Sequence, residues 1–376
     1  MRRWLVVACM AIAPAAARAD TPPSVWDRAK DPAVGETYRL HVEAQRRATQ
    51  ADSDMGAIER RYVPEGQSSA MRARVMLERS KAESSPDPRL RFDLGFVYLI
   101  LAKTEDRSLY PRAAEVLQGA LAMAPDHPLA ERGWRALSEA CGHTGDHDCE
   151  KKAYTEVLRR EVEERARATP TLNLAEVEMH LGNLPEAIEG YREALRLASR
   201  GLSPETGPLA VWGLAVALDR SGDRLGAERE ARFAIDLERS MGLETTGQRV
   251  SVLLHTTGVF FVPDYEVTWY EGVGAAALAK APQQTAAEAA RLWQISERMF
   301  GLYVRGAEQS YELRRRLREA KPASERGPEV APDRWLELAK VRLAAAKGER
   351  EKAEKRRGRE PAPKPSARDV DPDVQL

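Results

Sequence analysis

One pattern of small and apolar residues recurs at nearly constant spacing through the middle of this chain. Its equivalent positions 113, 150, 187 and 227 are separated by 37, 37 and 40 residues. In the clearest copy a Gly-containing turn at 182–183 follows one amphipathic segment, and Ala187, Tyr191 and Ala194 then share one face of a second. Helical hairpins repeated at such a period bury their apolar faces only by stacking on one another. The sequence therefore predicts an extended helical array.

The other copies keep the same order of residues. Each has apolar residues in a first helix, a glycine, and small or aromatic residues in a second: Leu94, Gly95, Tyr98, Ala113, Leu117 and Ala120; Trp134, Leu137, Gly145, Tyr154, Val157 and Leu158; Leu214, Leu218, Gly222, Ala227, Ala231 and Ala234. This succession resembles the tetratricopeptide repeat (TPR). The resemblance implies an all-α fold, a TPR-type α-solenoid of stacked antiparallel helical hairpins. The chain departs from the family at Glu150 and Glu178.

The repeats suggest a division of the chain into five segments. We expect a signal peptide at 1–19, a helical segment at 20–85, four TPR-like units at 86–240 and degenerate TPR-like helices at 241–320. A capping helix and a basic, Pro-containing disordered tail complete the chain at 321–376, since prolines at 361, 363 and 365 are incompatible with helix. Residues 259–265 are aromatic and β-branched, and we interpret them as an apolar loop, with a short strand as the alternative.

The N-terminus has the three parts of a secretory signal. Arg2 and Arg3 precede an uncharged stretch at 4–17, and Ala17 and Ala19 form a small-x-small cleavage site. We therefore expect cleavage after Ala19 and a periplasmic or secreted protein. The alternative is a lipoprotein processed at Cys9, whose apolar segment would be unusually short. Cleavage after Ala19 leaves 55 basic and 58 acidic residues, a net charge of −3.

Two cysteines and two histidines share a stretch of nine residues, 141–149, at a predicted turn between two helices. In an oxidising compartment, Cys141 and Cys149 are expected to form a disulfide that joins the two helices of a hairpin. One alternative is a zinc site made by Cys141, His143, His147 and Cys149, although this spacing is more compressed than usual. Another is that these residues are ordinary core positions of the hairpin. We expect no metal at this turn.

No catalytic or cofactor motif stands out. A GxGxxA match at 272–277 lacks the preceding strand of a dinucleotide-binding turn and is better explained by close helix packing. The sequence therefore predicts neither an enzyme nor a cofactor. The chain has 58 basic and 58 acidic residues, which gives no overall attraction to nucleic acid. The basic stretch at 340–368 could contact an anionic membrane surface, or could simply keep the chain soluble.

The resemblance also implies a binding groove lined by the first helix of each repeat. Carried over unit by unit, its positions are Phe92, Phe96, Arg132, Arg135, Glu139, Leu172, Glu176, His180, Trp212, Val216 and Arg220. Among these, Trp212 and Arg135 are the expected main contacts, because aromatic and guanidinium groups dominate most interfaces.

The resulting hypothesis is a non-catalytic exported TPR scaffold or adaptor that binds protein partners in the bacterial cell envelope. One alternative is an accessory factor or enzyme acting on cell-wall or polysaccharide substrates. Another is a metal-responsive adaptor that uses Cys141, His143, His147 and Cys149.

Overall fold

The computed structural model describes residues 64–199, 203–243, 249–256, 262, 264–326 and 329–358. The expected signal peptide, the helical segment up to residue 63, most of the expected apolar loop at 259–265 and the Pro-containing tail from residue 359 lie outside these residues. Every regular element in the described part is a helix. The chain divides between His127 and Pro128 into two compact units.

The first unit contains α3 (Pro64–Arg79), α4 (Pro88–Thr104) and α5 (Tyr110–Met123). Asp87 initiates α4, because its carboxylate accepts a hydrogen bond from the backbone N–H of Arg89 while Pro88 occupies the first turn. Helices α4 and α5 form an antiparallel hairpin in which a Cβ at Gly95 would lie 2.6 Å from Leu117 Cγ. The glycine therefore leaves room for the Leu117 side chain where these two helices touch.

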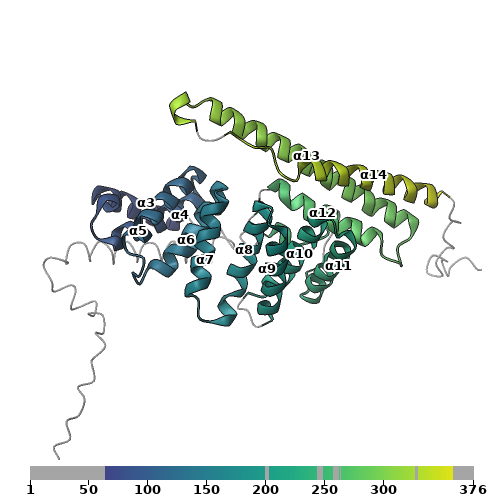
Figure 1. The fold of residues 1–376 in the computed structure, drawn as a ribbon, viewed down its shortest axis with the longest axis horizontal. Coiled ribbons are helices and arrows are strands. Elements are labelled where there is room, and N and C mark those ends of the chain that lie inside the picture. Colours follow the sequence, from purple (N-terminus) through teal and green to yellow (C-terminus); the bar gives the residue numbers. More distant parts are fainter. Residues whose placement is uncertain are drawn as a thin grey trace, which may run out of the picture. The chain divides into compact units, whose positions relative to one another are not determined.

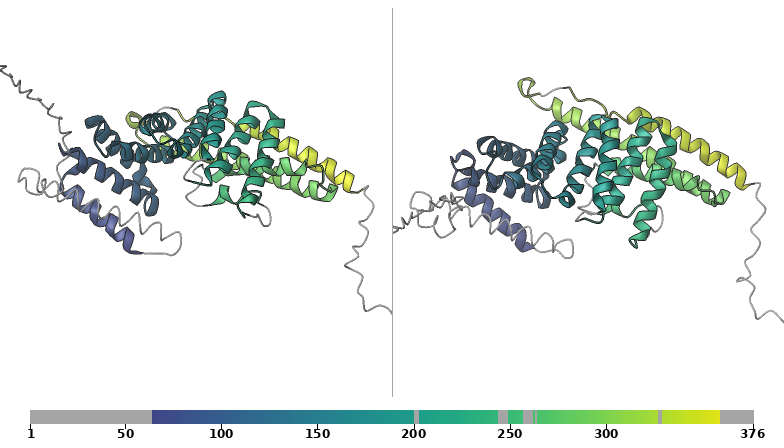
Figure 2. Two further views of the ribbon diagram at one scale, coloured as in Figure 1. Left: turned by 90° about the horizontal axis from the view of Figure 1, so that it is seen from below. Right: turned by 60° about the horizontal axis from the view of Figure 1, so that its bottom comes forward.

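The second unit consists of four hairpins followed by one more helix (Figure 1). In chain order, the helices are α6 (Ala130–Thr144) and α7 (His147–Arg160), α8 (Ala168–Leu181) and α9 (Leu184–Ala198), α10 (Thr206–Ser221) and α11 (Arg224–Ser240), α12 (Asp264–Ala279) and α13 (Ala286–Glu319), and α14 (Leu336–Arg357). The other views show α14 lying alongside α13 (Figure 2).

A Gly-Asp or Gly-Asn pair makes the turn in three of these hairpins. Helices α6, α8 and α10 each end at a glycine in the left-handed conformation, with φ between 72° and 97°: Gly145, Gly182 and Gly222. Glycine adopts this conformation without the steric cost that a Cβ brings. The next residue begins the second helix, and Asp146 and Asp223 also accept a backbone N–H of its first turn.

Alanine and tyrosine positions hold neighbouring hairpins together. Ala187, Tyr191 and Ala194 of α9 are fully buried, and the Tyr191 ring lies against α10 at Gly213. A Cβ at position 213 would come within 2.2 Å of that ring, so the small residue makes room for the large one. Gly274 of α12 lies against Trp212 in a similar way, so the glycines at 272–277 serve helix packing.

The predicted all-α fold is confirmed in the described residues, and the second unit has the expected stack of antiparallel helical hairpins. Helix α14 lies where the capping helix was expected; it has 22 residues and packs along α13. Among the described helices, none is both long enough and apolar enough to span a membrane.

Candidate functional site

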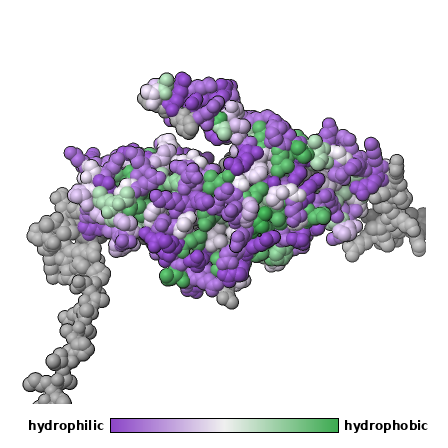
Figure 3. Space-filling model, in the orientation of Figure 1, coloured by the Kyte–Doolittle hydropathy of each residue, from purple (hydrophilic) through white to green (hydrophobic). Residues whose placement is uncertain are grey.

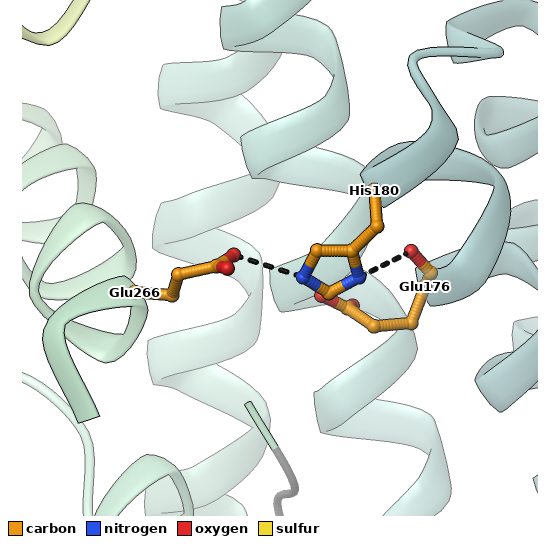
Figure 4. A group of neighbouring side chains, drawn as sticks. All are labelled: Glu176, His180 and Glu266. Carbon is orange, nitrogen blue, oxygen red and sulfur yellow. Dashed lines mark hydrogen bonds and ion pairs between the residues drawn. The ribbon is translucent and has the colours of Figure 1, made fainter. Parts of the chain in front are cut away.

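Polar side chains meet where α8, α10 and α12, the first helices of three successive hairpins of the second unit, lie next to one another. We call the side of the stack that these first helices form its inner side. Helix α8 carries Glu176 and His180, which are one turn apart and therefore share a face. Helix α12 contributes Glu266, whose carboxylate points at the imidazole of His180 (Figure 4). Helix α10 contributes Arg220, with Nη2 3.6 Å from Glu266 Oε2. We call these four residues the inner cluster.

Hydrogen bonds fix the orientation of the inner cluster. His180 Nε2 is 3.0 Å from Glu266 Oε2, and His180 Nδ1 is 3.0 Å from the backbone carbonyl oxygen of Glu176. The Glu176 carboxylate accepts from the Tyr270 hydroxyl at 2.9 and 3.1 Å, and from the Tyr191 hydroxyl. Each acidic group and the imidazole therefore have only a small range of orientations.

Burial and neighbouring charges change the pKa values of this site. Burial disfavours the charged form of His180, but Glu266 and Glu176 outweigh it and raise the pKa of His180 to about 9. Burial would also raise the pKa of Glu266, but His180 and Arg220 lower that pKa to about 2. His180 and Glu266 therefore form an imidazolium–carboxylate pair at neutral pH.

Arg220 is the most unusual member of the inner cluster. Its side chain is 0% exposed, and its guanidinium lies between the rings of Trp269 and Trp335, 4.9 and 5.0 Å from their centroids. None of its three side-chain nitrogens has a hydrogen-bond acceptor among the described residues. Buried guanidinium groups almost always have acceptors, so this arrangement calls for an explanation.

The segment that precedes and begins α14 covers the inner cluster, and we call residues 333–342 the C-terminal strap. Arg342 Nε lies 2.9 Å from Asp219 Oδ1 of α10, and both side chains are buried. Trp335 stacks on Arg220, and Asp333 accepts from the Tyr303 and Tyr265 hydroxyls at 3.0 and 3.1 Å. The inner side of the stack is therefore filled by the protein itself.

The residues carried over from the repeat family lie in several places. Glu176, His180 and Arg220 meet in the inner cluster, while Leu172 is buried elsewhere on α8. The remaining predicted positions are not part of this cluster: Phe92 and Phe96 are buried in α4 of the first unit, Arg132, Arg135 and Glu139 lie on α6, and Trp212 and Val216 are buried in α10.

The two residues expected as main contacts have other partners. Trp212 is fully buried, and its indole N–H donates to Glu238 Oε1 at 2.7 Å. Arg135 forms ion pairs with Glu131 and Glu161 on the surface of the hairpin. Trp212 therefore has no surface to offer a partner, and the expectation that it is a main contact is wrong.

The cysteine turn lies next to the inner cluster. Cys141 and Cys149 form a disulfide across the α6–α7 turn, with their Cα atoms 5.9 Å apart. Both sulfurs are used in this bond, so neither is available as a thiolate ligand for zinc together with His143 and His147. Instead, the His147 ring stacks on the His180 ring with centroids 4.7 Å apart.

Sequence reasoning missed the half of the site that comes from later helices. Glu266, Tyr270, Asp333, Trp335 and Arg342 lie beyond the four clear repeats, where no repeat position identified them. An available signal was the unusual density of aromatic and acidic residues at 264–271, which suits a polar interface between helices better than solvent.

On the face of the second unit that Figure 3 shows, hydrophobic side chains form small groups among hydrophilic ones. A hollow of about 400 Å³ lies along α13 and is lined mainly by charged residues: Arg305, Glu308, Gln309, Glu312, Leu313 and Arg316.

No family model and no curated protein matches this chain. Several solved structures resemble it in part. MamA AMB-1 is 18% identical with a TM-score of 0.40 over 53% of this chain and 98% of that one. BtubC (BKLC) from P. vanneervenii is 16% identical with a TM-score of 0.39 over 71% and 97%. A signal transduction ATPase with a tetratricopeptide repeat sensor from Pyrococcus horikoshii is 11% identical with a TM-score of 0.41 over 77% and 45%. At these TM-scores the likenesses carry no information about what this chain binds.

Proposed function

We propose that this protein is a non-catalytic adaptor that binds segments of other proteins in the bacterial cell envelope. The observation that carries the proposal is the way in which the second unit holds its own C-terminal strap. A protein segment is already seated against the inner side of the hairpins, through side chains that a segment from another protein could present.

Three contacts define what this surface recognises. Trp335 and Arg342 are seven positions apart, close to two helical turns. The tryptophan packs on Arg220, and the guanidinium pairs with Asp219. Arg334 directly precedes Trp335 in the sequence. Its side chain lies over the α8–α9 turn, where a Cβ at Gly182 would be 1.8 Å from Arg334 Nη1. A partner segment would therefore combine an aromatic ring with a guanidinium group about seven positions later.

Recognition of this segment can be tested with a labelled peptide of residues 329–358 added to the mature protein. The tethered strap of the wild-type protein should exclude the peptide, because a tethered segment has an effective concentration of about millimolar. A Trp335→Ala/Arg342→Ala protein, checked for folding by circular dichroism, should bind the peptide at least about tenfold more tightly, as measured by fluorescence anisotropy.

The matched control is the same peptide carrying both alanines, which should not bind the double variant. Equal binding of the two peptides, or of the natural peptide to both proteins, would contradict the proposed surface.

The location in the envelope is supported by the predicted signal and by the disulfide. A disulfide persists in the periplasm but is rare in the reducing cytoplasm. Intact-protein mass spectrometry of the envelope fraction should therefore find a chain that begins at Asp20, with Cys141 and Cys149 oxidised. A version that lacks residues 2–19 should remain in the cytoplasm with both thiols open to alkylation. A full-length N-terminus in the envelope fraction, or export of the shortened version, would count against this location.

A further inference from the structure

The inner cluster gathers three potential metal ligands. Glu176, His180 and Glu266 each offer one ligand atom, and these atoms all lie within 4.8 Å of one another. Atoms that bind a common transition-metal ion at about 2.0–2.2 Å are separated by up to about 4.4 Å. Small rotations of the carboxylate side chains would therefore be enough to bring all three onto one ion.

The surrounding hydrogen bonds are of the kind that supports metal ligands. His180 Nδ1 faces the Glu176 carbonyl oxygen at 3.0 Å, so it keeps its proton in that bond, while Nε2 faces Glu266 at 3.0 Å and would give up its proton to bind an ion there. Metal-binding histidines are typically held by such a bond from their other nitrogen. The Tyr270 and Tyr191 hydroxyls hold the carboxylate of Glu176 in the same manner.

Arg220 is an independent observation that points to an oxygen-bearing ligand at this cluster. It is buried, directed at Glu266, and without a hydrogen-bond acceptor among the described residues. An oxygen on a bound ion would supply the acceptor. A divalent cation, two carboxylates, a neutral His180 and Arg220 together carry a charge of +1, which a hydroxide or carboxylate ligand on the ion would neutralise.

We propose that Glu176, His180 and Glu266 bind one divalent transition-metal ion, and that Arg220 donates to an oxygen ligand of that ion. One imidazole nitrogen and two carboxylate oxygens suit Zn²⁺, Mn²⁺ or Co²⁺, whereas Mg²⁺ binds imidazole poorly. The site is separate from the Cys141–Cys149 turn, and it does not depend on the adaptor function.

The test uses untagged mature protein freed of metal by chelation. Titration calorimetry should show one Zn²⁺ bound per chain and no binding of Mg²⁺, and Co²⁺ should give a visible absorption band typical of bound ligands. Glu266→Gln and His180→Gln should each weaken Zn²⁺ binding at least about a hundredfold and abolish the Co²⁺ band, since even supporting residues contribute about 10- to 100-fold.

His255→Gln is the matched control, because His255 Nε2 also lies 3.0 Å from a glutamate, Glu271, but belongs to no three-ligand group in the described residues. This variant should bind Zn²⁺ like the wild type. If a variant at 180 or 266 does not fold, Glu176→Gln takes its place, and the wild-type Co²⁺ spectrum remains informative. Absence of one-to-one binding, undiminished binding by Glu266→Gln, or equal loss in His255→Gln would overturn the proposal and leave the cluster as a structural ion pair.

Discussion

Replacing Arg342 by methionine should lower the free energy of unfolding of the second unit by about 3–5 kcal/mol, because the change leaves a buried carboxylate without its cation. Asp219 and Arg342 are both less than one-tenth exposed, and Arg342 also donates to the backbone oxygen of residue 219 at 3.0 Å. In the variant, Asp219 would keep only the indole N–H of Trp269, at 3.1 Å. Chemical denaturation followed by circular dichroism measures the loss, and hydrogen exchange should locate it first in α14.

Lys340→Ala is the control for this prediction, since Lys340 lies on the same helix and pairs with Glu337 and Glu308 on the surface. Exposed pairs contribute at most about 1 kcal/mol, so its effect should be small. Combining Arg342→Met with Asp219→Leu should recover part of the stability, because it removes the buried charge together with its partner. A loss in Arg342→Met no larger than that in Lys340→Ala would show that the strap is not held by this ion pair.

Replacing Glu238, near the end of α11, by alanine is the second change expected to lower the free energy of unfolding strongly. Its buried carboxylate accepts from the indole N–H of Trp212 at 2.7 Å, the hydroxyl of Ser251 at 2.5 Å, and the backbone N–H groups of Val252 and Leu253 at 2.8 and 3.3 Å. Glu238→Ala leaves these donors without an acceptor, and each such buried group costs about 1–3 kcal/mol. We expect a loss of about 4 kcal/mol in denaturant unfolding, after allowing for water reaching some of the donors.

Asp236→Ala is the matched variant on the same helix, because Asp236 forms an exposed pair with Arg239. It should change stability by less than about 0.5 kcal/mol. Glu238→Gln keeps the shape but loses one accepting oxygen, so it should lie between the two alanine variants. If Glu238→Ala and Asp236→Ala were equally mild, the loop at 250–253 would have to be held by other contacts.

The repeat pattern predicts the hairpins well because their determinants are local. A glycine that adopts positive φ, a capping residue after it and alanines at helical spacing act within a single hairpin, as at Gly182, Ala187 and Ala194. At the start of α3, Pro64 and Gly66 both lie in the first turn of the helix. Proline is tolerated there because the first N–H groups of a helix have no partner within the helix.

The site could be predicted only in part, because it depends on contacts between residues far apart in the chain. The repeat positions identified Glu176, His180 and Arg220, but no local pattern shows that α12 would bring Glu266 against His180, 86 residues away. The position of the C-terminal strap is even harder to predict from the sequence, since Arg342 and Asp219 are 123 residues apart. Position within a repeat identified Trp212 as a groove residue, whereas the packing of α12 over α10 makes it a core residue.

Direct contact between α8 and α12 also affects how this array could change in length. In ordinary repeat proteins each unit touches only its neighbours, so units can be duplicated or deleted with little disturbance elsewhere. Here Tyr270 and Glu266 of α12 reach past the intervening hairpin to Glu176 and His180 of α8. Inserting or removing a hairpin between them would separate both pairs, so these hairpins are no longer interchangeable modules and must be inherited, or engineered, as a single block.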